Sequence, residues 1–517
     1  MAWFDEAVFY HIYPLGLVKA PKKNEYTTPV ARIKQLIPWV DHLVAIGCNA
    51  LYIGPLFQSV GHGYETTDYK LLDSRLGTNE DLVDFVKYCH EKKVHVIFDG
   101  VFNHVGRDFF AFQDVKKKRE NSVYKDWFCH INFQEDNSYH DGFCYENWGG
   151  YDLLVKLNQR NPEVIDYICS IIQYWVDTFD VDGIRLDTAD VLDFDFMKAL
   201  RQKANTVKPD FYLMGEVIHG EYNRWSNPEH LHAVTNYALH KALYSGHNEH
   251  NYFEIAHTVK RLYEMGHNDP LGIRLYNFVD NHDVSRIASK LTNPAHLIPV
   301  HILLYTLPGV PSIYYGSEWA IEGKKTKGSD WNLRPCLNLK ERKDIALTQV
   351  IATLGHVRQT TPALSYGAYQ EVLLTNRQYA FYRGNVLVMV NNDEAPAHFD
   401  LAIENGIYTG VLSGQVIEVK DGHVSIDLPA CGGEIWLPDH QETFEPIDYQ
   451  MDMPKQKEIS LPKEVRHVPY EQMSVAELQA CILQKMAKNG PVTEQMKQSV
   501  LENVYPDSLL NWVKSFR

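Results

Sequence analysis

The sequence predicts an α/β protein with the (β/α)₈ architecture of a TIM barrel. Over residues 7–359, apolar segments typical of buried strands alternate with segments of helical spacing, and the alternation makes eight units. Near-continuous apolar strands joined by helices indicate a parallel sheet whose outer face is covered. Eight such units close most simply into a barrel, and an open doubly wound sheet is the alternative. No G-x-G-x-x-G follows the first strand to favour that alternative.

Each strand is expected where a short apolar or alternating run is bounded by turn residues. In residues 183–190, Ile184 and Leu186 alternate with Arg185 and Asp187, a period of two that places both charged groups on one face. The expected strands span residues 7–14, 50–57, 95–104, 183–190, 211–217, 232–238, 275–283 and 312–321. The expected helices span residues 32–47, 79–93, 162–179, 193–207, 252–266, 296–307 and 344–359.

The pattern of these elements also sets the expected domains. The barrel is expected over residues 1–365, with an inserted loop domain at about 105–158 after the third strand. Residues 366–438 hold short strands separated by Gly, Asn and Asp turns, which predicts an antiparallel β-sandwich. A linker rich in Pro and charge and a helical extension follow over 439–517, with an S-x-x-E capping box at Ser474.

The helical extension carries apolar stripes that need a partner. We expect these stripes to pack on the body of the protein, and a contact between subunits is the alternative, so a homo-oligomer is left open. The stripe residues are Leu478, Ile482 and Met486 on the first helix and Met496, Val500 and Val504 on the next.

Composition narrows the range of partners. The 517 residues include 66 Asp and Glu against 50 Lys and Arg, and the formal charge of −16 argues against a nucleic-acid or anionic membrane partner. Eight cysteines without a C-x-x-C pair indicate reduced thiols. The N-terminus lacks the pattern of a secretory signal, and the most apolar window, 296–315, is interrupted by histidines and prolines. We therefore expect a cytoplasmic protein that does not span a membrane.

Charged and imidazole side chains gather at the predicted strand ends. In a parallel barrel the active site forms where the carboxyl ends of the strands meet. A lone Arg-x-Asp is most simply a structural ion pair, but the convergence of four strands at one rim indicates a catalytic site. We expect Arg185 to keep Asp187 ionised, as a nucleophile requires. The strand-end residues are Asp99, Asn103, His104, Arg185, Asp187, Glu216, Asp280, His282 and Asp283.

These strand ends also resemble a known family. D-G-V-F-N-H (99–104), G-I-R-L-D (183–187), G-E-V (215–217) and V-D-N-H-D (279–283) are similar, in order and strand position, to the four signature segments of α-amylase family glycoside hydrolases. The resemblance spans about residues 7–438.

Segments between the strands resemble one branch of that family. F-F-A-F-Q-D-V (109–115), Y-K-D-W-F (124–128) and K-L-N (156–158) look like the neopullulanase, cyclomaltodextrinase and maltogenic amylase branch. That branch usually carries an additional N-terminal β domain that builds its dimer, whereas this chain starts directly at the first strand.

The resemblance implies roles for the residues at the barrel mouth. Asp187 would be the nucleophile that forms a covalent glucosyl ester, and Glu216 the general acid and then the base. Asp283 would be the third carboxylate, which grips the hydroxyls of the sugar. Six further side chains are expected to hold substrate, although each alone would more often be a core residue. They are Tyr64, His104, Trp148, Arg185, His282 and Arg286.

The resemblance is incomplete at the positions that bind calcium in the family. Calcium-dependent members typically carry a Lys-His pair after the nucleophile, where this chain has Asp190 and Val191. The loop before the fourth strand reads L-V-K-L-N (154–158) and lacks the usual Asp, although Asn103 could still ligate a cation. We therefore expect no metal site of the family type and no required cofactor.

The expected activity is retaining hydrolysis of α-glucans. The enzyme would cleave α-1,4 bonds, and α-1,6 bonds less readily, in maltooligosaccharides, cyclodextrins or related starch fragments by double displacement. Two alternatives stay open: an α-glucosyl transferase or isomerase that uses the same site, and a non-catalytic carbohydrate-binding relative. Such relatives typically lose catalytic carboxylates, whereas this chain keeps Asp187, Glu216 and Asp283.

Overall fold

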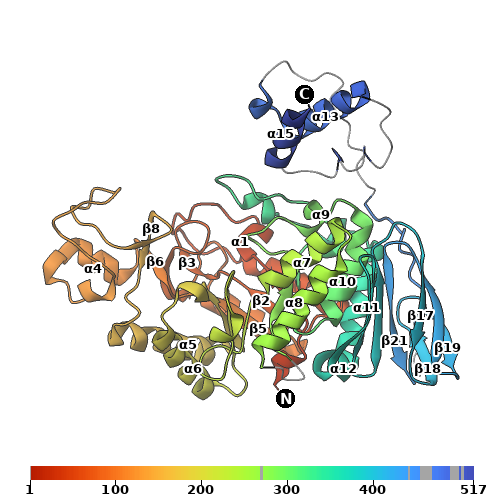
Figure 1. The fold of residues 1–517 in the computed structure, drawn as a ribbon. Helices are drawn as coiled ribbons and strands as arrows, with labels where there is room; N and C mark the ends of the chain where they lie inside the picture. The colour runs from red at the N-terminus through yellow and green to blue at the C-terminus, as the bar shows by residue number, and fades with distance from the viewer. Residues whose placement is uncertain are drawn as a thin grey trace. The chain divides into compact units, whose positions relative to one another are not determined.

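The structure is a computed structural model (Figure 1), and its chain forms two compact units, Met1–Pro454 and Lys455–Arg517. The described residues are 2–267, 272–439, 443–454, 469–489, 496, 500, 501 and 506–516.

The first unit is built on the predicted parallel barrel. Its strands pair in the order β11-β10-β9-β5-β2-β1-β13-β12, and a parallel bridge between Thr235 and Tyr276 joins the two ends of the sheet. The (β/α)₈ prediction is therefore confirmed. The strands are β1 (Phe9–Ile12), β2 (Ala50–Ile53), β5 (His95–Val101), β9 (Gly183–Asp187), β10 (Tyr212–Gly215), β11 (Ala233–Val234), β12 (Tyr276–Phe278) and β13 (Val310–Tyr314).

One face of the barrel strands changes from apolar to charged along the chain direction. Ile97 belongs to a buried apolar cluster with side chains of other barrel strands, such as Phe9 of β1 and Met214 of β10. Because side chains on one face recur every second residue, Asp99 shares the face of Ile97. Asp99 pairs in register with Arg185 on β9, so the charged groups lie above an apolar floor.

Helices follow most barrel strands, and several begin at clear capping residues. The Asn161 side chain accepts a hydrogen bond from Glu163 at the start of α5, where Pro162 occupies the first helical position. The helices are α1 (Pro14–Leu17), α2 (Ile37–Ala45), α3 (Asn79–Glu91), α5 (Pro162–Phe179), α6 (Phe194–Val207), α7 (Tyr237–Asn248), α8 (Tyr252–Met265), α9 (Ile287–Lys290), α10 (Leu297–Thr306), α11 (Ala346–Thr360) and α12 (Pro362–Tyr366).

Helix α7 is a departure from the sequence expectation. A strand was expected over 232–238, but β11 covers only Ala233–Val234 and α7 begins at Tyr237. The Asn236 side chain starts the helix by accepting a hydrogen bond from the backbone N–H of Leu239 at 3.0 Å. The residues that α7 buries recur with helical spacing (Leu239, Ala242, Leu243 and Gly246), so the helix begins inside the segment that was expected to be a strand.

The inserted segment forms a small layer beside the barrel (Figure 1). β6 pairs antiparallel with β8, which also pairs with β7, and α4 lies in the same segment. A separate hairpin of β3 and β4 follows β2. The bounds are β3 (Phe57–Ser59), β4 (Thr66–Leu72), β6 (His104–Gly106), α4 (Phe110–Lys118), β7 (Asn147–Trp148) and β8 (Tyr151–Lys156).

The C-terminal part of the first unit is the expected antiparallel β domain. A six-stranded sheet in the order β14-β15-β16-β21-β18-β19 and a two-stranded sheet of β17 and β20 share one buried cluster, which includes Leu387, Phe399 and Trp436. Helix α10 contacts β16 and β21. The strands are β14 (Tyr369–Leu374), β15 (Gln378–Arg383), β16 (Val386–Asn391), β17 (Ala397–Ala402), β18 (Gly406–Gly410), β19 (Val416–Val419), β20 (His423–Leu428) and β21 (Gly432–Pro438).

Part of the expected linker belongs to the first unit. Ile447 donates its backbone N–H to Leu412 O at 3.0 Å, and the Ala346 N–H donates to Met451 O at 2.9 Å. The hydroxyl of Tyr449 donates to Gly433 O at 2.8 Å. These contacts fasten residues 443–454 to the barrel and its β domain.

The second unit is a small helical body. Ser474 and Glu477 form the predicted capping box before α13 (Val475–Asn489), and α15 spans Pro506–Ser515. Of the predicted apolar stripes, Leu478, Ile482, Met486 and Val500 pack within this unit, whereas Met496 is exposed. Its buried residues are Leu478, Ile482, Val500, Leu509 and Val513, whereas Val504 lies outside the described residues. No described helix has the length and apolar character that crossing a membrane requires.

Candidate active site

One arginine organises the barrel mouth. Arg185, which is 3% exposed, donates from Nη1 to Asp99 Oδ1 at 2.8 Å and to Asp187 Oδ1 at 3.0 Å. Its Nη2 contacts Glu216 Oε2. Carboxylates from three adjacent strands or strand ends therefore meet on a single guanidinium, whose planar fork fixes their positions.

The second carboxylate oxygen of Glu216 has a partner of its own. The hydroxyl of Tyr237 donates to Glu216 Oε1 at 2.8 Å, and Asn281 Nδ2 donates to the same hydroxyl oxygen at 3.3 Å. Tyr237 is the first residue of α7, the helix that the sequence did not predict. Its hydroxyl holds Glu216 from the side opposite Arg185.

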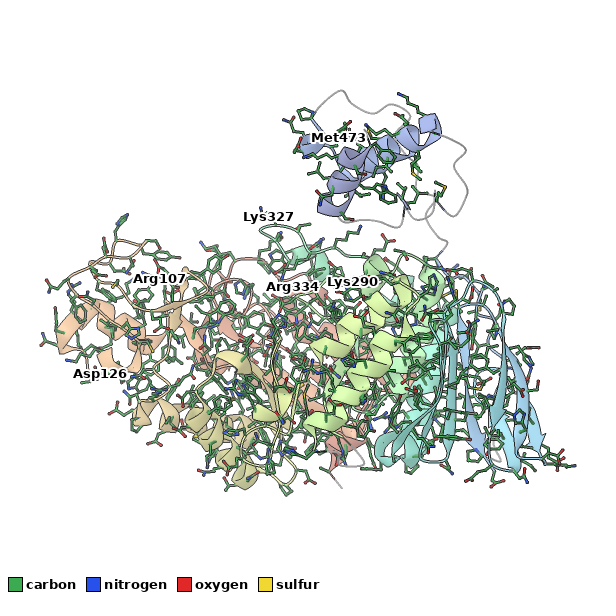
Figure 2. All side chains as sticks on the ribbon, viewed as in Figure 1. Arg107, Asp126, Lys290, Lys327, Arg334 and Met473 are labelled. Carbon is green, nitrogen blue, oxygen red and sulfur yellow. The ribbon has the colours of Figure 1, made fainter. Side chains whose placement is uncertain are left out.

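Asp283 is held by an arginine and a histidine. Arg334 Nη2 donates to Asp283 Oδ1 at 2.7 Å, and His282 Nε2 lies 3.0 Å from Oδ2. Arg334 also donates from Nε to His282 O at 3.1 Å. Figure 2 shows Arg334 at the upper edge of the barrel unit, below the loop that carries Lys327.

Aromatic and imidazole side chains close the site on the side of the inserted segment. The Tyr64 hydroxyl donates to Asp99 Oδ2 at 3.0 Å and contacts His282 Nε2. His104 Nε2 lies 3.1 Å from Tyr64 O, and the Trp148 ring is centred 5.9 Å from the His104 ring. Trp148 is 37% exposed, which leaves its ring available to stack on a sugar.

The site holds more carboxylates than its arginines neutralise. The pKa values of these carboxyl groups shift in different directions. Burial raises the pKa of Glu216, and burial together with the Asp99, Glu216 and Asp283 carboxylates raises the pKa of Asp187. Burial would also raise the pKa of Asp283, but His282 and Arg334 hold it well below the usual range. The pKa of Asp283 is therefore lowered while the pKa values of Asp187 and Glu216 are raised, which separates the third carboxylate from the pair bound to Arg185.

Arg185 contacts more carboxylates than the sequence predicted. The sequence predicted that Arg185 keeps Asp187 ionised, because the two share a strand face. The structure divides the guanidinium among Asp99, Asp187 and Glu216, so its effect on any single carboxylate is diluted. Burial raises the pKa of Asp187, and Arg185 opposes that rise.

Arg286 lies outside this cluster, contrary to the expectation that it holds substrate. It is fully buried and donates from Nη1 to Tyr315 O at 2.7 Å and from Nη2 to Leu333 O at 3.1 Å. The guanidinium also stacks 3.9 Å from the centre of the Tyr314 ring. These contacts make Arg286 a support for the chain that follows β13.

Two residues of the site were missed by sequence reasoning. Arg334 lies in an irregular loop that no local pattern marks. Tyr237 lies near the carboxyl end of the expected strand 232–238, and this position at the barrel rim could have marked it. Tyr64, His104, Trp148, Arg185 and His282 are brought together as expected with Asp187, Glu216 and Asp283.

Comparison with known proteins agrees with this geometry. A family model described as the catalytic domain of α-amylase matches residues 32–351. The chain is 31% identical over 443 residues to a cyclomaltodextrinase of a Bacillus species, which covers 80% of this chain and 77% of that protein. An intracellular maltogenic amylase of Bacillus subtilis is 28% identical over 422 residues, with coverages of 74% and 70%.

Solved structures show the same relationship. A cyclomaltodextrinase structure superposes with a TM-score of 0.74 at 28% identity, and the match covers 84% of this chain and 78% of the other. The matched region includes the strand ends that carry Asp187, Glu216 and Asp283 within residues 32–351. The chain belongs to the α-amylase family of glycoside hydrolases and is similar to its cyclomaltodextrinases and maltogenic amylases.

Proposed function

We propose that the enzyme is a retaining hydrolase that cleaves α-1,4 bonds, and α-1,6 bonds less readily, in maltooligosaccharides, cyclodextrins or related starch fragments. The main support is the shared guanidinium: Asp187 and Glu216 are bound to the two terminal nitrogens of Arg185. Retaining glycosidases need two carboxyl groups close together, about 5–5.5 Å apart, because no water stands between nucleophile and sugar.

In the first step Asp187 attacks the anomeric carbon. Arg185 binds Oδ1 of Asp187, which leaves Oδ2 to form the ester bond. The glycosidic C–O bond breaks as Glu216 transfers its proton to the leaving oxygen. The raised pKa of Glu216, caused by burial, keeps that proton available near neutral pH.

In the second step a water molecule replaces the departed sugar. Glu216, now ionised, takes a proton from the water, whose oxygen attacks the anomeric carbon and releases Asp187. Two inversions give net retention of configuration. Asp283, fixed in its ionised form by Arg334 and His282, accepts hydrogen bonds from sugar hydroxyls in both steps.

The names of the relatives support the proposed substrate and cellular location. The similar proteins are named as a cyclomaltodextrinase and an intracellular maltogenic amylase, and we extend their class of α-glucan to this enzyme. We also propose a cytoplasmic location. Incubation with maltotriose, β-cyclodextrin, pullulan and soluble starch tests the substrate class: we expect faster hydrolysis of the two small substrates, and release of sugar from none of the four contradicts the proposal.

The linkage preference provides a prediction of its own. Thr188 follows the nucleophile and carries a hydroxyl. Among members of the family that act on small substrates, a Val at this position tends to accompany α-1,6 specificity. We expect kcat/KM to be higher for maltotriose than for isomaltotriose. The ratio of the two kcat/KM values measures how much more tightly the enzyme binds one transition state than the other. A preference for isomaltotriose contradicts the assignment.

Tyr237→Phe is expected to move the alkaline limb of the pH–rate profile to higher pH. The hydroxyl bond from Tyr237 lowers the pKa of Glu216, so its removal lets Glu216 keep its proton to higher pH. Tyr52→Phe is the matched control, because the Tyr52 hydroxyl donates to Asp99. The profile of kcat/KM against pH tests the prediction, and an unmoved limb in Tyr237→Phe refutes the assigned contact.

We also propose that catalysis requires no calcium. The Asn103 oxygen already accepts a hydrogen bond from Gln159 Nε2 at 3.0 Å, so it is committed within the protein. Exhaustive chelation is expected to leave kcat/KM on maltotriose nearly unchanged, and added calcium is expected to have no effect. A large loss of kcat/KM that calcium restores contradicts this proposal.

A further inference from the structure

A second cluster of chemistry-bearing side chains lies where the barrel helices meet the C-terminal β domain. His250 lies between α7 and α8, His296 ends the short helix before α10, and Glu394 lies in the turn between β16 and β17. One potential ligand atom from each of the three lies within 4.8 Å of the others. None of these residues takes part in the mechanism above.

Asn392 fixes the orientation of both imidazoles. Its side-chain Nδ2 lies 3.5 Å from Gly246 O, which turns its Oδ1 toward His250 Nδ1 at 3.3 Å. Its backbone carbonyl faces His296 Nε2 at 3.0 Å. Because a carbonyl only accepts hydrogen bonds, His250 carries its proton on Nδ1 and His296 carries its proton on Nε2.

In the neutral form of each ring, the opposite nitrogen carries a lone pair that can bind a metal ion. Within the described residues, Nδ1 of His296 is buried and has no hydrogen-bond partner. A buried acceptor nitrogen without a partner is costly, which makes it a candidate metal ligand.

His250 Nε2 faces the carboxylate of Glu394. His250 Nε2 lies 3.4 Å from Glu394 Oε1, and two electron-rich atoms at that distance repel unless a proton or a cation lies between them. Arg377 Nη1 lies 3.5 Å from the other oxygen, Oε2, and leaves Oε1 to the histidine. A carbonyl orienting the far nitrogen of each imidazole is the usual arrangement around protein-bound metals.

We propose that His250, His296 and Glu394 bind one divalent transition-metal ion of the Zn²⁺ type, with a further position open to water. Two imidazole nitrogens and one carboxylate oxygen form a common ligand set for zinc. Zinc ligands in a tetrahedral site lie about 3.3 Å from one another, so the cluster must contract slightly on binding. The Glu394 side chain is 51% exposed, which gives it freedom to move and gives the ion a path of entry.

The ion would join three separate segments of the first unit. Its ligands come from the α7–α8 loop, the start of α10 and a turn of the β domain, so binding ties the barrel to the β domain. Binding to the folded state alone raises stability in proportion to the logarithm of the ligand concentration. The expected consequence of binding is a higher melting temperature, with no change in the rate of α-glucan hydrolysis at the barrel mouth.

The test uses the full-length protein after exhaustive chelation, titrated with Zn²⁺ alone. We expect one high-affinity ion per chain by calorimetry and a rise of several degrees in Tm. His250→Asn removes a ligand and suits the backbone, because His250 has a positive φ of 47° that Asn tolerates. In this variant the affinity for Zn²⁺ is expected to fall more than about 100-fold. That loss exceeds the one typical when a residue that only hydrogen-bonds to a metal ligand is removed.

A matched control removes a histidine elsewhere in the β domain. His398 pairs with Asp427 at 2.7 Å on the exposed side of β17, and His398→Asn is expected to bind Zn²⁺ as the wild type does. Co²⁺ gives a second readout, since a low-coordinate nitrogen and oxygen site produces visible absorption that His250→Asn should lose. The proposal is overturned if the wild type binds no Zn²⁺ or if His250→Asn binds Zn²⁺ equally well.

Discussion

Replacing Asp187 by Asn is expected to abolish turnover and leave the fold intact. The amide has the volume of the carboxylate but cannot form the glucosyl ester, so the chemical step loses its nucleophile. Removal of an activated nucleophile costs about 10,000-fold or more in kcat. The measurement is kcat on maltotriose together with the melting temperature of the variant. Burial raises the pKa of Asp187, so replacement by a neutral group also relieves repulsion and should not lower Tm.

Asp190→Asn is the matched control for this substitution. Asp190 is exposed and follows the nucleophile closely in the sequence. Its replacement by Asn also exchanges a carboxylate for an amide, but at a position away from the reacting atoms. We expect the control to retain most of the wild-type kcat. An Asp187→Asn enzyme with near wild-type activity removes Asp187 from the role of nucleophile.

Arg185→Met is expected to have the largest combined effect on activity and stability. The substitution leaves Asp99, Asp187 and Glu216 buried without the cation that binds all three. Breaking a buried ion pair from one side costs about 3–5 kcal/mol of stability. Arg185→Lys restores a charge but not the planar fork, so it should recover part of the stability and little of the kcat.

The stability deficit of Arg185→Met is expected to grow from acidic to neutral pH. Burial already raises the pKa values of Asp187 and Glu216 above those of the unfolded chain, about 4, and loss of the arginine raises them further. Groups with raised pKa values in the folded state contribute their stability below the unfolded pKa and lose it as pH rises through the folded value. Thermal unfolding of both proteins from pH 5 to pH 8 measures the difference, and a deficit that shrinks with pH refutes the account.

Local sequence patterns predicted the parts of the molecule that are themselves local. The alternation around Arg185 and Asp187 predicted a strand with both groups on one face, and β9 confirms it. The capping box at Ser474 predicted the start of α13 for the same reason, since a cap is decided within four residues. Barrel topology then brought the strand ends to one rim.

Other features depend on contacts between distant segments and could not be predicted. Arg334 reaches Asp283 from 51 residues further along the chain, through a loop without periodicity. Arg286 shows the reverse: it lies close to Asp283 in sequence, but the chain turns and buries its side chain against carbonyls near Leu333. His250 and His296 are also far apart in the sequence, so no motif of closely spaced ligands predicted that they would lie together.

Trapping the covalent intermediate is the most direct test of the proposed mechanism. In Glu216→Gln, an α-maltosyl fluoride substrate can still form the ester because fluoride leaves without a proton, whereas hydrolysis of the ester lacks its general base. Mass spectrometry of the intact protein, followed by peptide mapping, is expected to show one maltosyl group on Asp187. An added group on another residue, or complete turnover with inversion of configuration, contradicts the double-displacement mechanism at this site.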